Sequence, residues 1–277
     1  MNALIRGCAV ILPLMFLSAC TAPQSSDHSV SANLQAERQN TEAIAALFEQ
    51  AHATGVLLVK HQGKIQAYGN ALDRANTAYL PASTFKMLNA LIGIEHHKTS
   101  PEKVYPWHGE KRAFPAWEKD LSLSEAMTSS AVPVYQALAR DIGIDLMRQE
   151  VKRVKFGNAE IGTQVDNFWL VGPLKITPQQ EIEFADQLAH EQLPFSQSTQ
   201  QQVQKMLFIE KINSRTLYAK SGWAMDTEPQ VGWYTGWVED EQGNISTFSL
   251  NMEMHKDTPI NLRKELVIAS LKQLKIL

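Results

Sequence analysis

The stretch Pro81-Ala-Ser-Thr-Phe-Lys-Met-Leu-Asn-Ala-Leu-Ile-Gly-Ile94 places a serine and a lysine at the start of an apolar helical run. Ser83 and Lys86 are three residues apart, so a helix brings their side chains together on one face. The N-terminal end of a helix favours negative charge on the serine oxygen and offers backbone N–H groups to an oxyanion. Ser83 and Lys86 are therefore a candidate reactive pair. The alternative is a serine that only caps the helix, with a lysine on the surface.

A second Ser-x-x-Lys occurs at Ser100-Pro-Glu-Lys103, so the motif alone is weak. Because Ser100 precedes Pro101 and Glu102, it is typical of the N-cap of a solvated helix. The context of Ser83, with an apolar run behind it, favours the first match.

Two further candidate site segments, one at Ser130 and one at Lys220, come after Ser83 in the chain. Ser130 lies in Thr128-Ser-Ser-Ala-Val132, a short break between an expected helix that starts at Ser122 and one that stops at Gly143. Lys220-Ser-Gly222 ends an expected strand, where the glycine lets a ligand approach the strand edge. Taken singly, Ser130 is a helix cap and Lys220-Ser-Gly222 a strand exit.

Around these segments, strand patterns occur at both ends of the chain and helical patterns in residues 84–210. The expected strands are Gly55–Lys60, Ile65–Tyr68, Leu217–Lys220, Val231–Val238 and Ile245–Met252. Further helices are expected at Asn40–His52, after the capping boxes at Ser122 and Thr177, and at Pro259–Leu274. The pattern predicts an α+β fold, a mostly antiparallel sheet flanked by helices with an inserted helical lobe.

Residues 1–19 have the pattern of an export signal, with Arg6 as their only charge and an apolar run at Ala9–Leu17. Leu17-Ser-Ala-Cys20 resembles a bacterial lipobox, so we expect cleavage before Cys20 and lipidation of its thiol. The alternative is an ordinary signal with an incidental cysteine. Residues 20–40 are expected to form a flexible tether and residues 41–277 the catalytic domain, held in the periplasm at a membrane.

Composition and the absence of certain motifs argue against several kinds of partner, metal site and enzyme. The 277-residue chain has a net charge of −3 and no basic cluster, which argues against nucleic acid. Cys8 would leave with the signal, so the exported protein has no disulfide. The eight histidines show neither HEXXH nor HXH, so no metal is expected. The lack of G-x-S-x-G argues against an α/β-hydrolase.

Ser-x-x-Lys, a serine in a helix break and Lys-[Ser/Thr]-Gly form the ordered triad of penicillin-recognising serine enzymes. Nearly the whole mature chain resembles class D (oxacillinase) β-lactamases, including their carbapenem-hydrolysing members. The matching segments are Pro81–Lys86, Ser130–Val132, Phe156–Asn158, Asp166–Leu174, Lys220–Trp223 and Asn261–Arg263. The family commonly has tyrosine at Phe156 and often threonine at Ser221, changes that affect supporting contacts or substrate range.

The resemblance implies the serine β-lactamase / penicillin-binding transpeptidase fold and a β-lactam hydrolase that acts through an acyl-enzyme on Ser83. The oxyanion would be held by the N–H groups of Ser83 and Trp223. Lys86 would be an N-carboxylysine, because burial favours the neutral amine that adds CO₂, and would act as general base. Trp169 would anchor this carbamate, with Val132 and Leu170 keeping it dry; the alternative for these three is plain core packing.

Other residues are implied on the substrate side. Ser130 and Lys220 would pass a proton to the lactam nitrogen. Arg263 would bind the substrate carboxylate beside Ser221. Phe114 and Met225 would meet across the mouth of the cleft. As a lone helix residue, Arg263 would lie on a solvated face.

Two other functions stay open on the sequence alone. A penicillin-sensing receptor stays acylated, but its class D-like members carry a polar residue at the position of Val132. A peptidoglycan transpeptidase typically has asparagine there. Turnover of a chromogenic cephalosporin separates them, because only a hydrolase releases product repeatedly. The expected partners are small β-lactams and, through Cys20, a membrane.

Overall fold

The computed structural model describes the backbone of residues 25–277 and the side chains of residues 34–277. The expected export signal and Cys20 lie outside the described residues. Among the described residues, no helix has both the length and the apolar character needed to cross a membrane. The chain divides after Arg38 into two units, the second of which is Gln39–Leu277.

Helix α1 (Ser25–Gln50) starts far earlier than the expected helix at Asn40–His52. The expectation of a coil-like tether is therefore wrong from Ser25 onward. The segment is polar but contains alanine, leucine, glutamine, glutamate and arginine, which have high helix propensity without an apolar stripe. The last turns of α1 bury Ile44 and Phe48 completely.

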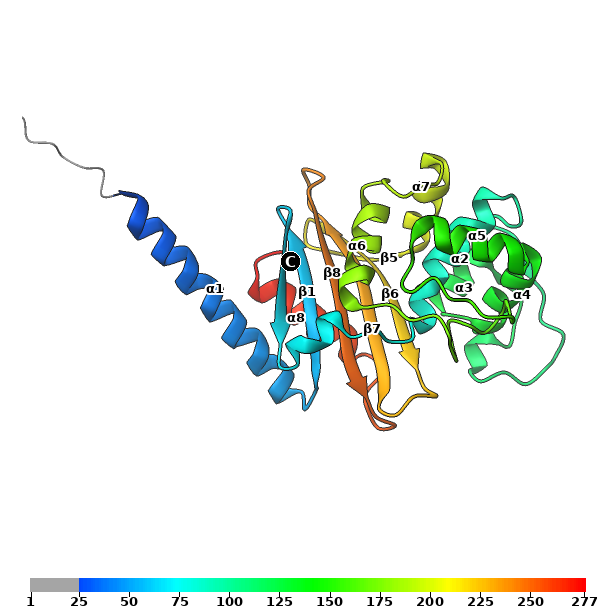
Figure 1. Cartoon of the computed structure of the whole chain (residues 1–277), viewed down its shortest axis with the longest axis horizontal. Helices are drawn as coiled ribbons and strands as arrows, with labels where there is room; N and C mark the ends of the chain where they lie inside the picture. The colour runs from blue at the N-terminus through cyan, green and yellow to red at the C-terminus, as the bar shows by residue number, and fades with distance from the viewer. Residues whose placement is uncertain (1–24) are drawn as a thin grey trace, which may run out of the picture. The chain divides into compact units, whose positions relative to one another are not determined.

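A six-stranded antiparallel sheet has the strand order β2-β1-β8-β7-β6-β5 (Figure 1). It combines two strands from the first part of the sequence with four from the last part. Its strands are β1 (Gly55–His61), β2 (Lys64–Gly69), β5 (Phe208–Ile212), β6 (Arg215–Ala224), β7 (Gln230–Glu239) and β8 (Ile245–Met254). Strand β1 pairs directly with β8, which confirms a sheet built from both termini. Strand β6 continues beyond the expected end at Lys220, because the next four residues also pair with β7.

The two faces of the sheet differ, as the alternation along β8 shows. Phe248, Leu250 and Met252 belong to an apolar cluster with the end of α1 and with α8 (Leu262–Gln273). Thr247, Ser249 and Asn251 alternate with them and are also buried. Helix α6 (Pro178–Ala189) packs on β8, β7 and β1. Thr247 hydrogen-bonds to Asp186 of α6, so α6 covers the polar face.

The segment between the sheet halves is the expected helical lobe (Figure 1). It contains η1 (Leu72–Asn76), η2 (Ala82–Phe85), α2 (Lys86–Glu95), η3 (Pro115–Trp117), α3 (Leu123–Thr128), α4 (Val132–Ile142), α5 (Ile144–Val154), α6 and α7 (Gln197–Met206), with a small sheet of β3 (Val104–Tyr105) and β4 (Leu121–Ser122). The apolar residues of α2 belong to the largest apolar cluster, and every residue from Lys86 to Ile94 is buried.

The two helix starts expected from capping boxes are confirmed. Both capping boxes are present, at Ser122 with Glu125 and at Thr177 with Gln180. The helix expected after Ser100 is absent. Ser100 instead accepts a hydrogen bond from the Lys103 backbone N–H in a turn that leads into β3, and Pro101 is buried there.

Candidate active site

Ser83 lies on η2 and Lys86 is the first residue of α2, so the motif sits at the junction of a tight turn and a buried helix. The Lys86 Nζ donates a hydrogen bond to the Ser83 Oγ at 2.6 Å. Ser83 is half-buried whereas Lys86 is fully buried. The hydroxyl is therefore accessible while the amine that could activate it is kept from water.

The turn that carries Ser83 is held in an unusual backbone conformation. Ala82 has a φ of 49°, in the left-handed region that costs a non-glycine residue roughly 1–2 kcal/mol. Its N–H donates to the Trp169 carbonyl at 3.0 Å, and the Thr84 hydroxyl donates to the Pro81 carbonyl at 2.9 Å. The surrounding structure thus fixes a strained turn next to the reactive serine, as is common at functional sites.

Ser130 occupies the expected break between α3 and α4, with a φ of 56°. The Lys220 Nζ donates to the Ser130 Oγ at 2.9 Å and to the Ser221 carbonyl at 3.0 Å. The helical lobe and the sheet each contribute one member of this pair. The Lys220–Ser130 pair therefore joins segments that lie far apart in the sequence, whereas Ser83 and Lys86 are three residues apart.

Gly222 brings the sheet against the turn of Ser83. A Cβ at this position would lie 3.0 Å from the Pro81 carbonyl oxygen and 3.3 Å from the Thr84 Cγ2. The glycine was expected to admit a ligand to the strand edge. It also has a structural role, since β6 packs on η2 here and a side chain would force the two apart.

Three basic side chains, Lys86, Lys220 and Arg263, are buried at the site. Burial, and then the charge of Lys220, hold the pKa of Lys86 well below its ordinary value. Burial, and then the charge of Arg263, lower the pKa of Lys220 to about 7. Burial lowers the pKa of Arg263 to about 10. Within residues 34–277 none of the three forms an ion pair, so the site favours an anionic ligand.

Arg263 lies on α8 but points into the site and not onto a solvated face. One of its Nη atoms donates to the Gly222 carbonyl, and its guanidinium lies 5.4 Å from the centre of the Trp223 ring. Its Nε is buried and has no hydrogen-bond partner. The structure therefore brings Arg263 to the strand of Lys220, with donor capacity left over.

Buried aromatic side chains surround Phe85, which precedes Lys86 in the chain. Trp169 is fully buried and stacks on Phe85, with ring centroids 5.2 Å apart. Its indole Nε1 has no hydrogen-bond partner, although a buried unpaired donor costs roughly 1–3 kcal/mol. Val132 and Leu170 are partly buried against the same apolar cluster.

Tyr135 also lies beside Lys86, although it was not among the site residues expected from the sequence. Its ring centroid lies 5.6 Å from the Lys86 Nζ, and its hydroxyl is directed to the Leu123 carbonyl at 3.5 Å. A signal was present, because Tyr135 follows Val132 by three residues and so shares its face of α4.

Phe114 and Met225 flank the site in sequence, and each is partly exposed, at 37% and 43%. Phe114 precedes η3, and its ring packs edge-on against Trp117 with centroids 4.7 Å apart. Met225 lies in the connection between β6 and β7.

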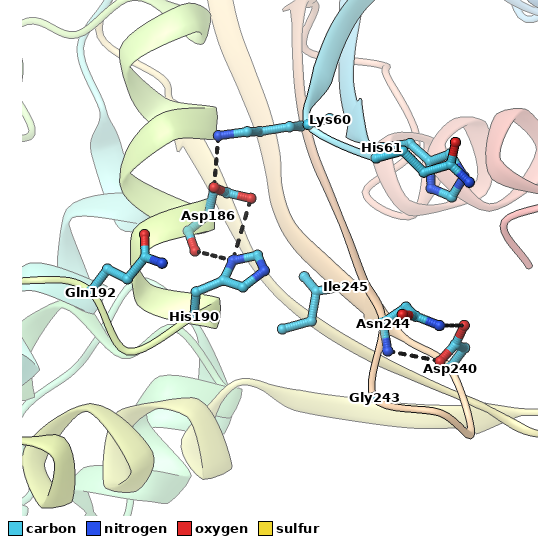
Figure 2. Close-up of a pocket in the computed structure, with 11 residues that line it drawn as sticks. Lys60, His61, Asp186, His190, Gln192, Asp240, Gly243, Asn244 and Ile245 are labelled. Carbon is cyan, nitrogen blue, oxygen red and sulfur yellow. Dashed lines mark hydrogen bonds and ion pairs between the residues drawn. The ribbon is translucent and has the colours of Figure 1, made fainter.

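A separate cavity of about 600 Å³ lies at one end of the sheet, between α6 and the β1–β2 and β7–β8 turns (Figure 2). Its polar side chains bind one another: Lys60 contacts Asp186 at 2.7 Å, and Asn244 binds Asp240. None of the site residues expected from the sequence lines it. In the part of the chain with described side chains, no cluster of three or more His, Cys, Asp or Glu could hold a metal ion.

Comparison with known proteins agrees with this geometry. A family model described as "Penicillin binding protein transpeptidase domain" matches residues 38–271. β-Lactamase OXA-48 of Klebsiella pneumoniae is 36% identical over 87% of this chain and 91% of the relative. The solved structure of class D β-lactamase YbXI from Nostoc is 36% identical, with a TM-score of 0.81 over 84% of this chain and 99% of that one.

The solved class D β-lactamase FUS-1 (OXA-85) of Fusobacterium nucleatum is 34% identical, also with a TM-score of 0.81, over 85% of this chain and 98% of that one. One family accounts for the α+β fold, the paired serines and lysines, and these similarities to known proteins. The chain belongs to the class D β-lactamases, serine hydrolases that open the β-lactam ring and confer resistance to β-lactam antibiotics.

Proposed function

We propose that this β-lactamase hydrolyses penicillins and carbapenems through an acyl-enzyme on Ser83, with Lys86 as general base. The observation that carries the proposal is the pair of lysine–serine hydrogen bonds, 2.6 Å at Ser83 and 2.9 Å at Ser130. Each hydroxyl has a basic group within hydrogen-bonding reach, which is the first requirement for proton transfer.

In acylation, the Ser83 Oγ attacks the lactam carbonyl carbon and transfers its proton to the base at Lys86. The C–N bond of the ring then breaks, and the nitrogen takes a proton from Ser130, which is replenished by Lys220. A pKa of about 7 suits Lys220 to this exchange near neutral pH. The backbone N–H groups of Ser83 and Trp223 would hold the oxyanion.

Substrate binding would use the positive charge of the site. Class D substrates carry a carboxylate next to the lactam ring, and Arg263 still has an unpaired buried Nε. The half-buried Ser221 hydroxyl lies beside Lys220 on β6 and is a second donor for this carboxylate. Charge-assisted bonds of this kind are roughly twice as strong as neutral ones.

We further propose that Lys86 carries CO₂ as a carbamate, which supplies an oxygen base for the serine and for the deacylating water. Three features support the fit. Lys86 is fully buried with a strongly lowered pKa, the Trp169 Nε1 lacks an acceptor, and Val132 and Leu170 are apolar. A neutral amine is the form that adds CO₂, and a free indole N–H is a donor for the added oxygens.

Carbapenem preference is proposed to come from Phe114 and Met225 closing over the cleft mouth. A methionine sulfur against an aromatic ring contributes about 0.3–1.5 kcal/mol, which is enough to hold a lid that can still open. The double substitution Phe114→Ala with Met225→Ala is expected to weaken imipenem binding about tenfold, or about 1.4 kcal/mol. Ampicillin hydrolysis should survive. Steady-state kinetics on both substrates measures this, and equal losses would indicate general damage to the site.

The lipobox suggests that the protein resides in the periplasm, anchored by a lipid on Cys20. The parent is expected to fractionate with membranes and the Cys20→Ser variant with the soluble periplasmic extract, because the variant lacks the thiol that is expected to carry the lipid. Immunoblots of the two fractions measure the difference. A parent that is already soluble would show that Cys20 carries no lipid.

A further inference from the structure

Trp223, which directly follows Lys220-Ser-Gly222 on β6, is held by a side chain of the neighbouring strand. Its indole Nε1 donates a hydrogen bond to the Gln230 Oε1 at 2.9 Å. Trp223 lies opposite Gly232 in the register of β6 and β7, and Gln230 comes two residues before Gly232. Alternate residues of a strand share one face of the sheet, so Gln230 and Trp223 lie on the same face. The orientation of the indole is therefore set from β7.

The same indole borders Arg263, the proposed ligand of the substrate carboxylate. The Arg263 guanidinium carbon lies 5.4 Å from the centre of the Trp223 ring. The aliphatic part of Arg263 lies against β7 at Gly232, where a Cβ would be 3.0 Å from the Arg263 Cδ. A guanidinium is attracted to an aromatic face, and more strongly when both are shielded from water. Because Arg263 is buried, the position of the indole contributes to the direction of the guanidinium.

The other contacts of Arg263 hold only part of the guanidinium. One Nη donates to the Gly222 carbonyl, and the other has a longer contact, 3.3 Å, with the Ile260 carbonyl. Its Nε has no hydrogen-bond partner. Within residues 34–277 no carboxylate pairs with the group. The aromatic contact with Trp223 therefore adds to two bonds to carbonyl groups, without an ion pair to fix the charge.

We propose that Gln230 is a positioning residue for substrate binding: by fixing the Trp223 indole it holds the Arg263 guanidinium in the direction that meets the carboxylate of a β-lactam. The inference rests on the proposed role of Arg263 and extends it to a side chain one contact further away. An indole has a single N–H, so loss of the Gln230 Oε1 removes the hydrogen bond that orients the ring. Arg263 then loses one of its supports, and the carboxylate binds less tightly.

The test compares kcat/KM for benzylpenicillin and for its methyl ester in the parent and in Gln230→Met. Methionine has a similar length but offers only a weakly accepting sulfur to the indole. The ester keeps the lactam ring and lacks the negative charge that Arg263 would bind. We expect the benzylpenicillin value to fall about fivefold, the scale of one lost hydrogen bond, mainly through KM. The ester value should stay within about twofold of the parent, which is below that scale.

The ratio between the two substrates separates positioning from general damage, because a partly unfolded enzyme loses activity on both alike. Gln242→Met is the matched control: it makes the same change at an exposed residue of the β7–β8 turn and should keep both parental values. Equal losses on acid and ester in Gln230→Met, or no loss on either, would overturn the proposal.

Arg263→Ala shows whether the proposed carboxylate site or only the role of Gln230 has failed. This substitution should lower the benzylpenicillin value about tenfold or more and spare the ester, since it removes a charge-assisted hydrogen bond. Adding Gln230→Met to it should cause no further loss, because Gln230 acts through Arg263. Equal effects of Arg263→Ala on both substrates would refute the carboxylate site itself. A selective effect of Arg263→Ala without one of Gln230→Met would refute only the role of Gln230.

Discussion

Replacing Ser83 with alanine is expected to abolish covalent labelling by a fluorescent penicillin, whereas Ser100→Ala should leave it intact. Both serines belong to a Ser-x-x-Lys, but only the Ser83 hydroxyl accepts a hydrogen bond from the side chain of its lysine, 2.6 Å from a fully buried amine. Lys103 instead contacts Asp141 and the Lys98 carbonyl on the surface. Without the Ser83 Oγ no ester can form, because the acyl group has no oxygen to join.

A denaturing gel after incubation with the fluorescent penicillin measures this directly, since only a covalent product survives denaturation. The Ser83→Ala substitution removes one half-buried atom, so the fold should persist, which a thermal melt checks. A labelled band in the Ser83 variant, or its loss in the Ser100 variant, would contradict the assignment.

Replacing Lys86 with alanine is expected to lower the deacylation rate by about 10²–10⁴-fold, the usual contribution of a general base. The parent should give a carbamate signal in NMR spectra recorded with labelled CO₂, and this signal should vanish in Lys86→Ala. Burial holds the Lys86 amine neutral over a wider pH range than usual, since its pKa is well below 10.5. As pH falls, the amine is protonated and CO₂ is lost, so added bicarbonate should raise activity most at mildly acidic pH.

Lys103→Ala is the matched control, because it changes the exposed lysine of the second Ser-x-x-Lys without touching the site. It should keep both the carbamate signal and the parental rate, and chelators should change neither. A Lys86 variant that deacylates as fast as the parent would refute the role of this lysine.

The sequence alone was sufficient for features set by local spacing. The Ser83–Lys86 spacing, the two capping boxes and the break at Ser130 depend on residues within one or two helical turns, and all are present. The antiparallel sheet built from both termini also followed from the strand patterns at the two ends. Hydrophobic periodicity and helix capping depend on residues that are close together in the chain, so both can be recognised in a single sequence.

The expectations from local sequence patterns were wrong where weak or distant interactions decide the secondary structure. Helix α1 begins at Ser25 because propensity acts without an apolar stripe, so the periodicity that detects buried helices did not reveal it. Strand β6 runs on past Lys220 because β7 pairs with the added residues. Ser100 forms a turn and not a helix because the chain continues into β3, whose partner strand lies further along.

Only the tertiary structure decided which groups meet. The Lys220–Ser130 pair joins residues 90 positions apart, and no spacing rule connects them. Arg263 was expected at the substrate site only through the family resemblance, because a lone helix arginine would lie on a solvated face; the packing of α8 on the sheet brings it to the Gly222 carbonyl. Glu181 carried no motif at all. Complete burial raises the pKa of its carboxyl group, because folding removes the solvent that would stabilise the ionised form.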